Sequence, residues 1–119
     1  MSKKRDIELF IVDLLLAIHK VKLYTKEFSS YDDLQYSGLH WDASMRQLEI
    51  VGESINRLLD DDFFASLSPK YFRKVVNFRN SIVHGYFGID AEEVWDIIKN
   101  KLDILEVDLL SIIEKHFDL

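Results

Sequence analysis

Glycine and proline, the residues that most readily interrupt regular secondary structure, are scarce in this chain, with four glycines and one proline among 119 residues. Apolar residues recur at spacings of three and four positions, which is the period of an amphipathic helix. No stretch shows the strict alternation of apolar and polar residues that a half-buried strand requires. The sequence therefore predicts an all-α fold.

Four amphipathic segments are long enough to form helices that pack side by side. We expect these helices over residues 5–28, 41–59, 69–85 and 90–117. Ser68 followed by Pro69 is typical of a helix N-cap and the first helical position. Gly85 supplies a helix stop, and Asp90 with Glu93 three positions later matches a capping box. The expected architecture is an up-and-down four-helix bundle.

Length and composition describe one folded domain, spanning residues 1–119, with 48% hydrophobic and 30% charged residues. Because cysteine is absent, neither a disulfide nor a thiolate metal site can form, and we expect a cytoplasmic protein. The N-terminus lacks the pattern of a signal peptide. The longest apolar run, residues 14–18, is far shorter than the roughly 20 residues that span a bilayer, so we expect no membrane contact.

A net charge of -6 disfavours broad, non-specific binding of nucleic acid, so any RNA contact must be local. Basic and amide side chains gather in one short segment and could supply that contact. These candidate RNA-binding residues are Lys70, Arg73, Lys74 and Asn77. Arg73 and Asn77 also share a narrow polar stripe with Asn80 and His84, because the four lie at positions i, i+4, i+7 and i+11 of the third expected helix.

Arg79 falls inside the apolar arc of that helix, where an unpaired guanidinium would be costly. One interpretation is structural: Arg79 pairs with Glu53 or Glu49 on the second expected helix. The other is functional: Arg79 reaches around the helix end toward His84, and the two address a phosphate. Both can hold at once. Gly52, within the apolar stripe of the second expected helix, would let another helix approach closely.

Arg79, His84 and Tyr86 form an R-x4-H-x-Y arrangement. The surrounding sequence resembles the HepT-like branch of the HEPN superfamily. The similarity covers nearly the whole chain and is carried by residues 46–53, residues 77–90 and the Val94-Trp95 pair. The resemblance implies a four-helix toxin ribonuclease of a type II toxin-antitoxin pair, acting as a homodimer that forms around the motif helix, with the two motifs meeting in a shared cleft. Its partner would be a small MNT-type nucleotidyltransferase antitoxin that silences the toxin by transferring AMP to Tyr86.

In the expected mechanism, the RNA 2′-hydroxyl attacks its own phosphodiester and no metal or other cofactor takes part. His84 moves protons, Arg79 stabilises charge on the phosphorus, and Asn80 orients the imidazole or a phosphate oxygen. No paired-histidine or HExxH spacing indicates a metal site.

Two other functions fit the same residues. The chain could be a non-catalytic helical partner of a nucleotidyltransferase, in which case the polar stripe is a docking surface. It could also be a structural four-helix dimer with Arg79 paired and no active site.

Overall fold

The computed structural model describes residues 3–85 and 89–118, and within them the regular structure is helical throughout. In chain order the elements are α1 (Lys3–Thr25), α2 (Tyr31–Tyr36), α3 (Gly38–Leu59), α4 (Asp62–Leu67), α5 (Phe72–Gly85), α6 (Ala91–Asp96), the π-helical turn η2 (Ile97–Lys101) and α7 (Leu102–His116). The all-α fold class is confirmed.

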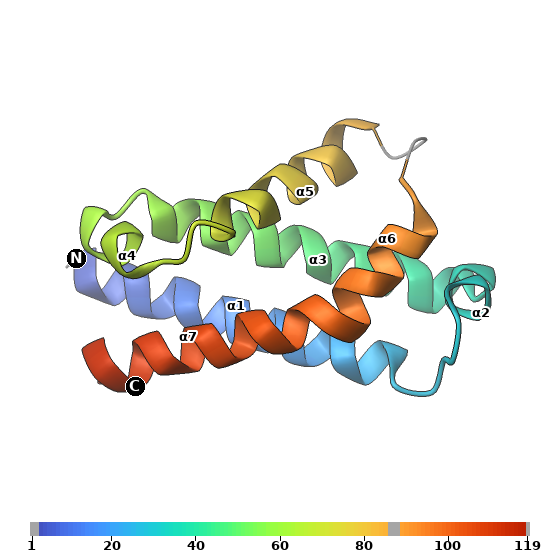
Figure 1. The fold of residues 1–119 in the computed structure, drawn as a ribbon, viewed down its shortest axis with the longest axis horizontal. Coiled ribbons are helices and arrows are strands. Elements are labelled where there is room, and N and C mark those ends of the chain that lie inside the picture. The colour runs from blue at the N-terminus through green and yellow to red at the C-terminus, as the bar shows by residue number, and fades with distance from the viewer. Residues whose placement is uncertain (1–2, 86–88, 119) are drawn as a thin grey trace.

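The long helices run lengthwise and alternate in direction (Figure 1). α1 lies against α3, α5 lies along the outer side of α3, and the segment from α6 to α7 returns beside α1. α4 and both chain ends lie at one end of the molecule, and α2 lies at the other. The C-terminal end of α5, whose last turn contains His84, rises away from the bundle.

A single cluster of buried apolar side chains holds these helices together. α1 contributes residues at spacings of four and three, among them Ile11, Leu14 and Ile18, each fully buried. α3 contributes Val51 and Ile55 to the same cluster. Because most helical stability comes from burying such a stripe, the period read from the sequence is sufficient to place the core faces.

Two short helices, α2 and α4, lie where the sequence predicts only connecting segments. Each is started by a side-chain cap: Ser30 Oγ accepts a hydrogen bond from Asp33 N at 3.2 Å, and Asp61 Oδ2 accepts one from Phe64 N at 2.9 Å. Each also buries one large side chain, Leu34 in α2 and Phe64 in α4. The caps satisfy backbone donors that would otherwise be orphaned, so one turn of helix is stable at each place.

The expected start of the third helix at Pro69 is wrong, because α5 begins at Phe72. Ser68 is not its N-cap. The Ser68 hydroxyl instead donates to Phe64 O at 2.8 Å and closes α4. Pro69 O accepts from Phe72 N at 3.1 Å, a tight turn that leads into the helix. The serine-proline pair therefore ends one helix and the turn after it opens the next.

The last expected helix is interrupted by η2, whose looser π-type winding the sequence did not predict. Asp90 caps α6 as expected, since its Oδ1 accepts from Glu92 N at 2.9 Å. Within the turn, Lys99 Nζ donates to Thr25 O at 3.2 Å, a carbonyl at the end of α1, and lies 4.7 Å from the centroid of the Trp95 ring. The turn thus ties the last helical segment to the first helix.

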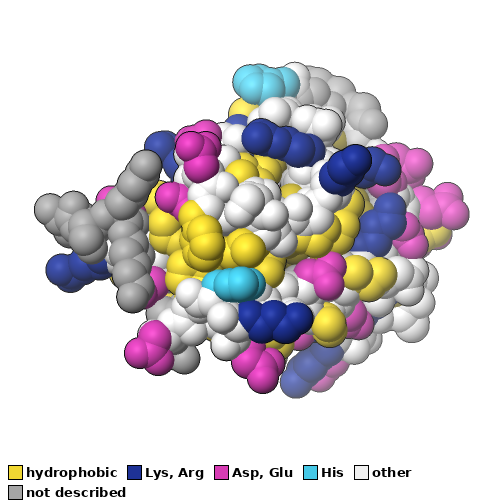
Figure 2. Space-filling view, turned by 60° about the vertical axis from the view of Figure 1, so that its left-hand side comes forward, with side chains coloured by type: hydrophobic (Ala, Val, Ile, Leu, Met, Phe, Trp, Pro, Cys, Tyr) yellow, Lys and Arg dark blue, Asp and Glu magenta, His cyan; other side chains and the backbone are white. Residues whose placement is uncertain are grey.

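Hydrophobic side chains gather in the middle of the face at the α4 end, with charged side chains around them (Figure 2). Phe63, which is 53% exposed, lies at this end with its ring centroid 5.9 Å from that of His116 and 6.2 Å from that of Phe117. None of the helices in the described part of the chain combines the length and apolarity needed to cross a membrane.

One hydrogen bond joins the turn before α5 to α7: Tyr71 Oη donates to Asp108 Oδ2 at 2.5 Å. Burial and this carboxylate raise the pKa of Tyr71. The unfolded tyrosine ionises near its ordinary value of about 10 while the folded one stays protonated, so the native state binds more protons above that pH and loses stability as the pH rises.

We therefore expect Tyr71→Phe to lower the free energy of unfolding by about 1 kcal/mol at pH 7 and to weaken the alkaline loss of stability above about pH 10. Urea unfolding at pH 7 and at a pH above about 10 measures both effects. Tyr36→Phe is the matched control, because Tyr36 is 94% exposed and should change neither value. Equal behaviour of the two variants would contradict the structural role of the Tyr71 bond.

Candidate functional site

The site is built on the contact between α3 and α5. At Gly52 the two helices come so close that a Cβ atom would lie 2.1 Å from Arg79 Cβ and 2.6 Å from Arg79 Cγ. Real Cβ atoms essentially never approach a neighbour this closely, so only glycine fits. The close approach that Gly52 was expected to allow is present, and it is made to Arg79 itself.

The Arg79 side chain, 26% exposed, is held by two partners. Its Nη2 lies 2.7 Å from Glu53 Oε2 on α3, and its Nη1 donates to Asn80 Oδ1 at 2.9 Å. Arg79 Nε is buried and has no hydrogen-bond partner among the described residues. Of the five N–H groups of a guanidinium, these contacts use one on each Nη, so besides the buried Nε–H one N–H on each Nη has no partner among the described residues.

The two candidate partners of Arg79 are in different environments. Glu53 bridges two arginines, because its Oε1 also accepts from Arg57 Nε at 3.2 Å. Glu49 does not contact Arg79 and instead lies 3.0 Å from Arg46 Nη1, one turn earlier on α3. Arg79 is thus paired with Glu53, as the structural interpretation expects, whereas its functional role toward His84 and a phosphate stays a prediction.

His84 lies near the end of α5 with its side chain exposed. Arg73 and Asn77 are also exposed, as expected for the polar stripe, whereas Asn80 is half-buried. No hydrogen bond or ion pair joins His84 to Arg79 within the described part of the chain, and Asn80 contacts Arg79 instead of the imidazole. The structure therefore brings Arg79, Asn80 and Glu53 together and leaves His84 facing solvent.

The candidate RNA-binding residues all reach solvent: Lys70 from the turn before α5, and Arg73, Lys74 and Asn77 from α5 itself. Lys74 and Asn77 line an open pocket of about 330 Å³ between α5 and the start of α6. Asp90 and Glu93 line its opposite side. These carboxylates would repel a phosphate placed in the pocket. An RNA backbone would therefore meet less repulsion on the outward face of α5.

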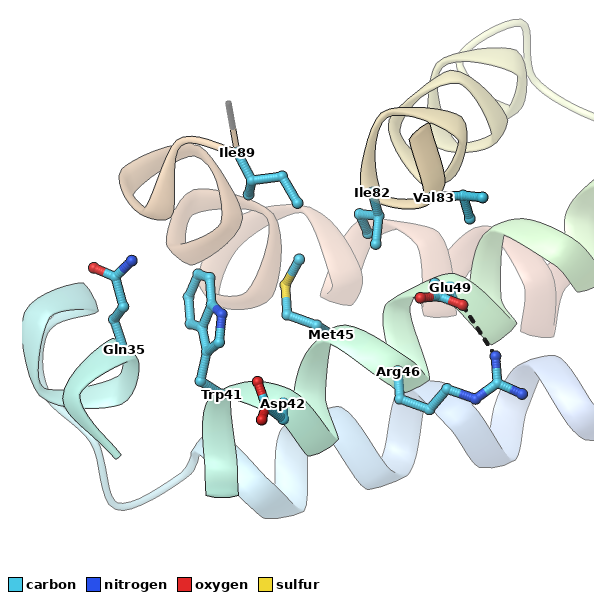
Figure 3. Close-up of a pocket in the computed structure, with 9 residues that line it drawn as sticks. All are labelled: Gln35, Trp41, Asp42, Met45, Arg46, Glu49, Ile82, Val83 and Ile89. Atoms are coloured by element: carbon cyan, nitrogen blue, oxygen red, sulfur yellow. Dashed lines mark hydrogen bonds and ion pairs between the residues drawn. The ribbon is translucent and has the colours of Figure 1, made fainter. Parts of the chain in front are cut away.

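A second open pocket, of about 420 Å³, lies beneath the raised end of α5 (Figure 3). Gln35 comes from α2, Trp41 and Met45 from the first turns of α3, Ile82 from α5, and Ile89 from just before α6. This pocket is not among the sites predicted from the sequence. No sequence signal could have found it, because its walls come from four separated segments and depend on how far α5 diverges from α3.

Tyr86, the residue expected to accept AMP, lies outside the described residues. Among the residues that the structure does describe, no group of three or more histidine, aspartate or glutamate side chains is gathered as a metal site would need.

These helices define a small all-α protein. On α5 it carries Arg79, which is paired with Glu53 of α3, and the exposed His84 near the helix end. The chain belongs to the HepT-like family of the HEPN superfamily: the family model described as "Ribonuclease HepT-like" matches residues 14–112. The family-level activity that this supports is that of a ribonuclease.

Two relatives are similar to this chain over most of both lengths. A protein of Methanocaldococcus jannaschii named "Putative RNase MJ1380" is 33% identical over 81% of this chain and 86% of its own length. One of Thermococcus cleftensis named "Probable ribonuclease HepT" is 29% identical over 87% of this chain and 92% of its own. No solved structure matches the chain significantly.

Replacing Gly52 should push α3 and α5 apart and disturb Arg79. We expect Gly52→Ala to lower the free energy of unfolding by about 1 to 3 kcal/mol, as overpacking of a close contact does. Gly38→Ala is the matched control, because a Cβ atom at Gly38, also in α3, would meet nothing within 4 Å. Chemical unfolding of the two variants gives the comparison, and a stable Gly52→Ala protein would show that the contact does not constrain the fold.

Proposed function

We propose that this protein is the toxin ribonuclease of a type II toxin-antitoxin pair and cuts RNA without a metal ion at a site formed by two copies of the chain. The observation that carries the proposal is the clamped Arg79, which keeps two N–H donors free beside the helix end that presents His84. Membership of the HepT-like ribonuclease family supports the reaction class.

The chemistry follows from these groups. The RNA 2′-oxygen attacks the adjacent phosphorus, the bond to the 5′-oxygen breaks, and a cyclic phosphate end is left. Arg79 binds the phosphate oxygens, where negative charge builds up in the transition state. His84 takes the proton from the 2′-hydroxyl or gives one to the leaving 5′-oxygen, a role that suits an imidazole near neutral pH. Asn80 holds the guanidinium by its amide oxygen, which leaves its NH₂ group available to a phosphate oxygen.

A homodimer explains why the single chain has one motif histidine and why the apolar Val83 beside it is exposed. In-line displacement needs an acid and a base on opposite sides of the phosphorus, but the single chain has one motif histidine. His84 is exposed, and within the described residues no hydrogen bond or ion pair joins it to Arg79 or Asn80. A second copy would supply the other imidazole. Val83, 38% exposed beside His84, provides apolar surface for such a contact at the same helix end.

Silencing by a nucleotidyltransferase completes the proposal. The Tyr86 oxygen would attack the α-phosphorus of ATP, forming a phosphodiester to the tyrosine and releasing pyrophosphate. The transferred AMP places an anion two positions after His84, where it would repel an RNA phosphate.

The catalytic assignment is tested with RNA cleavage in the presence of a chelator. We expect His84→Ala and Arg79→Ala each to lower the cleavage rate by at least about 100-fold, because one removes a general acid-base group and the other a donor that stabilises transition-state charge. His19→Ala is the matched control, because His19 is an exposed histidine on α1, away from the motif.

Circular dichroism and sedimentation would accompany the assay, so that unfolded or dissociated variants are recognised. The active protein should sediment at twice its chain mass of 14.0 kDa. Full cleavage by a folded His84→Ala protein would contradict the ribonuclease assignment. If the wild type cuts no RNA and the His84→Ala and Arg79→Ala variants lose nucleotidyltransferase binding, the result would favour the alternative in which the chain is a non-catalytic partner of that enzyme.

The modification is tested separately. Incubation with the cognate nucleotidyltransferase and ATP should add the mass of one AMP group to the wild type and stop cleavage, and Tyr86→Phe should remain unmodified and active. Intact-mass spectrometry and the cleavage assay give the two measurements. Tyr36→Phe is the control, because Tyr36 is the most exposed of the other tyrosines that the structure describes. If the Tyr86→Phe protein still gains the mass of AMP, the residue that accepts AMP is not Tyr86.

A further inference from the structure

We propose that the pocket beneath the end of α5 is a nucleobase subsite that takes one base of a bound RNA and prefers a base with an exocyclic amino group. The proposal rests on the ribonuclease function for the source of the base, although base binding can be measured without cleavage.

The walls of the pocket have the composition of a base-binding site. The Trp41 ring stands up from the first turns of α3 between Gln35 and Met45, and Ile82 and Ile89 close the pocket from above (Figure 3). Trp41 is half-buried against the core, which fixes its ring as a preformed surface. Stacking of a base on such a ring contributes about 1 to 3 kcal/mol.

The size and position of the pocket fit a single nucleotide next to the motif. Its volume of about 420 Å³ lies within the range of about 300 to 1,000 Å³ that small-molecule pockets occupy. Ile82 and Val83, which line it, directly precede His84 on α5. A base held here would therefore belong to a nucleotide close to the phosphate that the motif addresses.

The charges at the pocket favour a base edge over a phosphate. Asp42 and Glu49 contribute two carboxylates and Arg46 one guanidinium, which is already paired with Glu49 at 3.0 Å. A phosphate would be repelled by the exposed carboxylate of Asp42, whereas an amino group of cytosine or adenine can donate to it. Uracil lacks an amino group, so we expect it to bind more weakly.

The test uses the fluorescence of Trp41 in a Trp95→Phe protein, since these are the two tryptophans of the chain. The probes are 2′-O-methyl tetracytidylate, tetraadenylate and tetrauridylate, which cannot be cut by 2′-oxygen attack. We expect the first two to change the emission and to bind about fivefold more tightly than tetrauridylate, the effect of about one hydrogen bond. CMP and UMP form a parallel arm: if CMP binds as tightly as tetracytidylate, the pocket serves free nucleotides and the RNA assignment is overturned.

Asp42→Ala should remove the preference for cytosine and adenine. Asp32→Ala is the matched control, because Asp32 is also an exposed carboxylate in the first turns of a helix but does not line the pocket. The proposal is overturned by equal binding of all probes, by an unchanged preference in Asp42→Ala, or by a Trp41 signal that follows protein concentration instead of RNA concentration, which would assign the pocket to a second copy.

These outcomes separate the subsite from the proposed function. A wild type that shows the base preference but does not cut RNA contradicts the ribonuclease assignment alone. One that cuts RNA with no base-dependent Trp41 signal contradicts the subsite alone.

Discussion

The close packing of α5 on α3 at Gly52 is the constraint on which the site depends. Because there is no Cβ atom at Gly52, the Cβ and Cγ atoms of Arg79 lie against the backbone of α3. The guanidinium then comes within reach of Glu53, the residue after Gly52. Two adjacent residues of α3 thus act on the same arginine: one gives it space and the other gives it a partner. The usual cost of placing a guanidinium within an apolar arc is offset by this ion pair and by Asn80.

In the proposed ribonuclease site, the same pairing determines what kind of ligand Arg79 favours. Its charge is already partly balanced by Glu53, which also accepts from Arg57, so a weakly charged anion gains little there. A phosphodiester in a transition state, with extra negative charge on its oxygens, gains more from the two remaining N–H groups. An arginine held in this way is better suited to stabilise a developing charge than to bind RNA tightly in the ground state, which agrees with the acidic character of the chain.

Much of the fold could be predicted from periodicity, and the exceptions have definite causes. The apolar spacing in the four long segments was sufficient because burial of a stripe dominates helix stability. α2 and α4 were missed because each has six residues and depends on one cap and one buried side chain, Leu34 or Phe64, which is too little for a period to be visible. The start of α5 was misplaced because Ser68 and Pro69 are equally compatible with ending a helix.

The candidate site was predictable only in part. Gly52 could be recognised as a point of close approach, and the position of Arg79 within an apolar arc indicated that it needed a partner. Which carboxylate it pairs with, and that Asn80 binds Arg79 instead of His84, depend on side-chain directions at a helix crossing that sequence spacing does not specify. The pocket around Trp41 has no sequence signature, because it results from the divergence of α5.

The π-helical turn η2 has a consequence for how this sequence can vary. Ile98 in the turn and Leu102 just after it are both buried, so the extra residue per turn keeps the apolar face of α6 and that of α7 directed at the same core. Loss of one residue from this turn would restore ordinary winding but rotate α7 by about 100° relative to α6, turning one of the two apolar faces to water. The number of residues between Asp96 and Leu102 is therefore under physical constraint in addition to the buried Ile98. The exposed positions Asn100 and Lys101 should tolerate substitutions far better than the segment tolerates insertions or deletions.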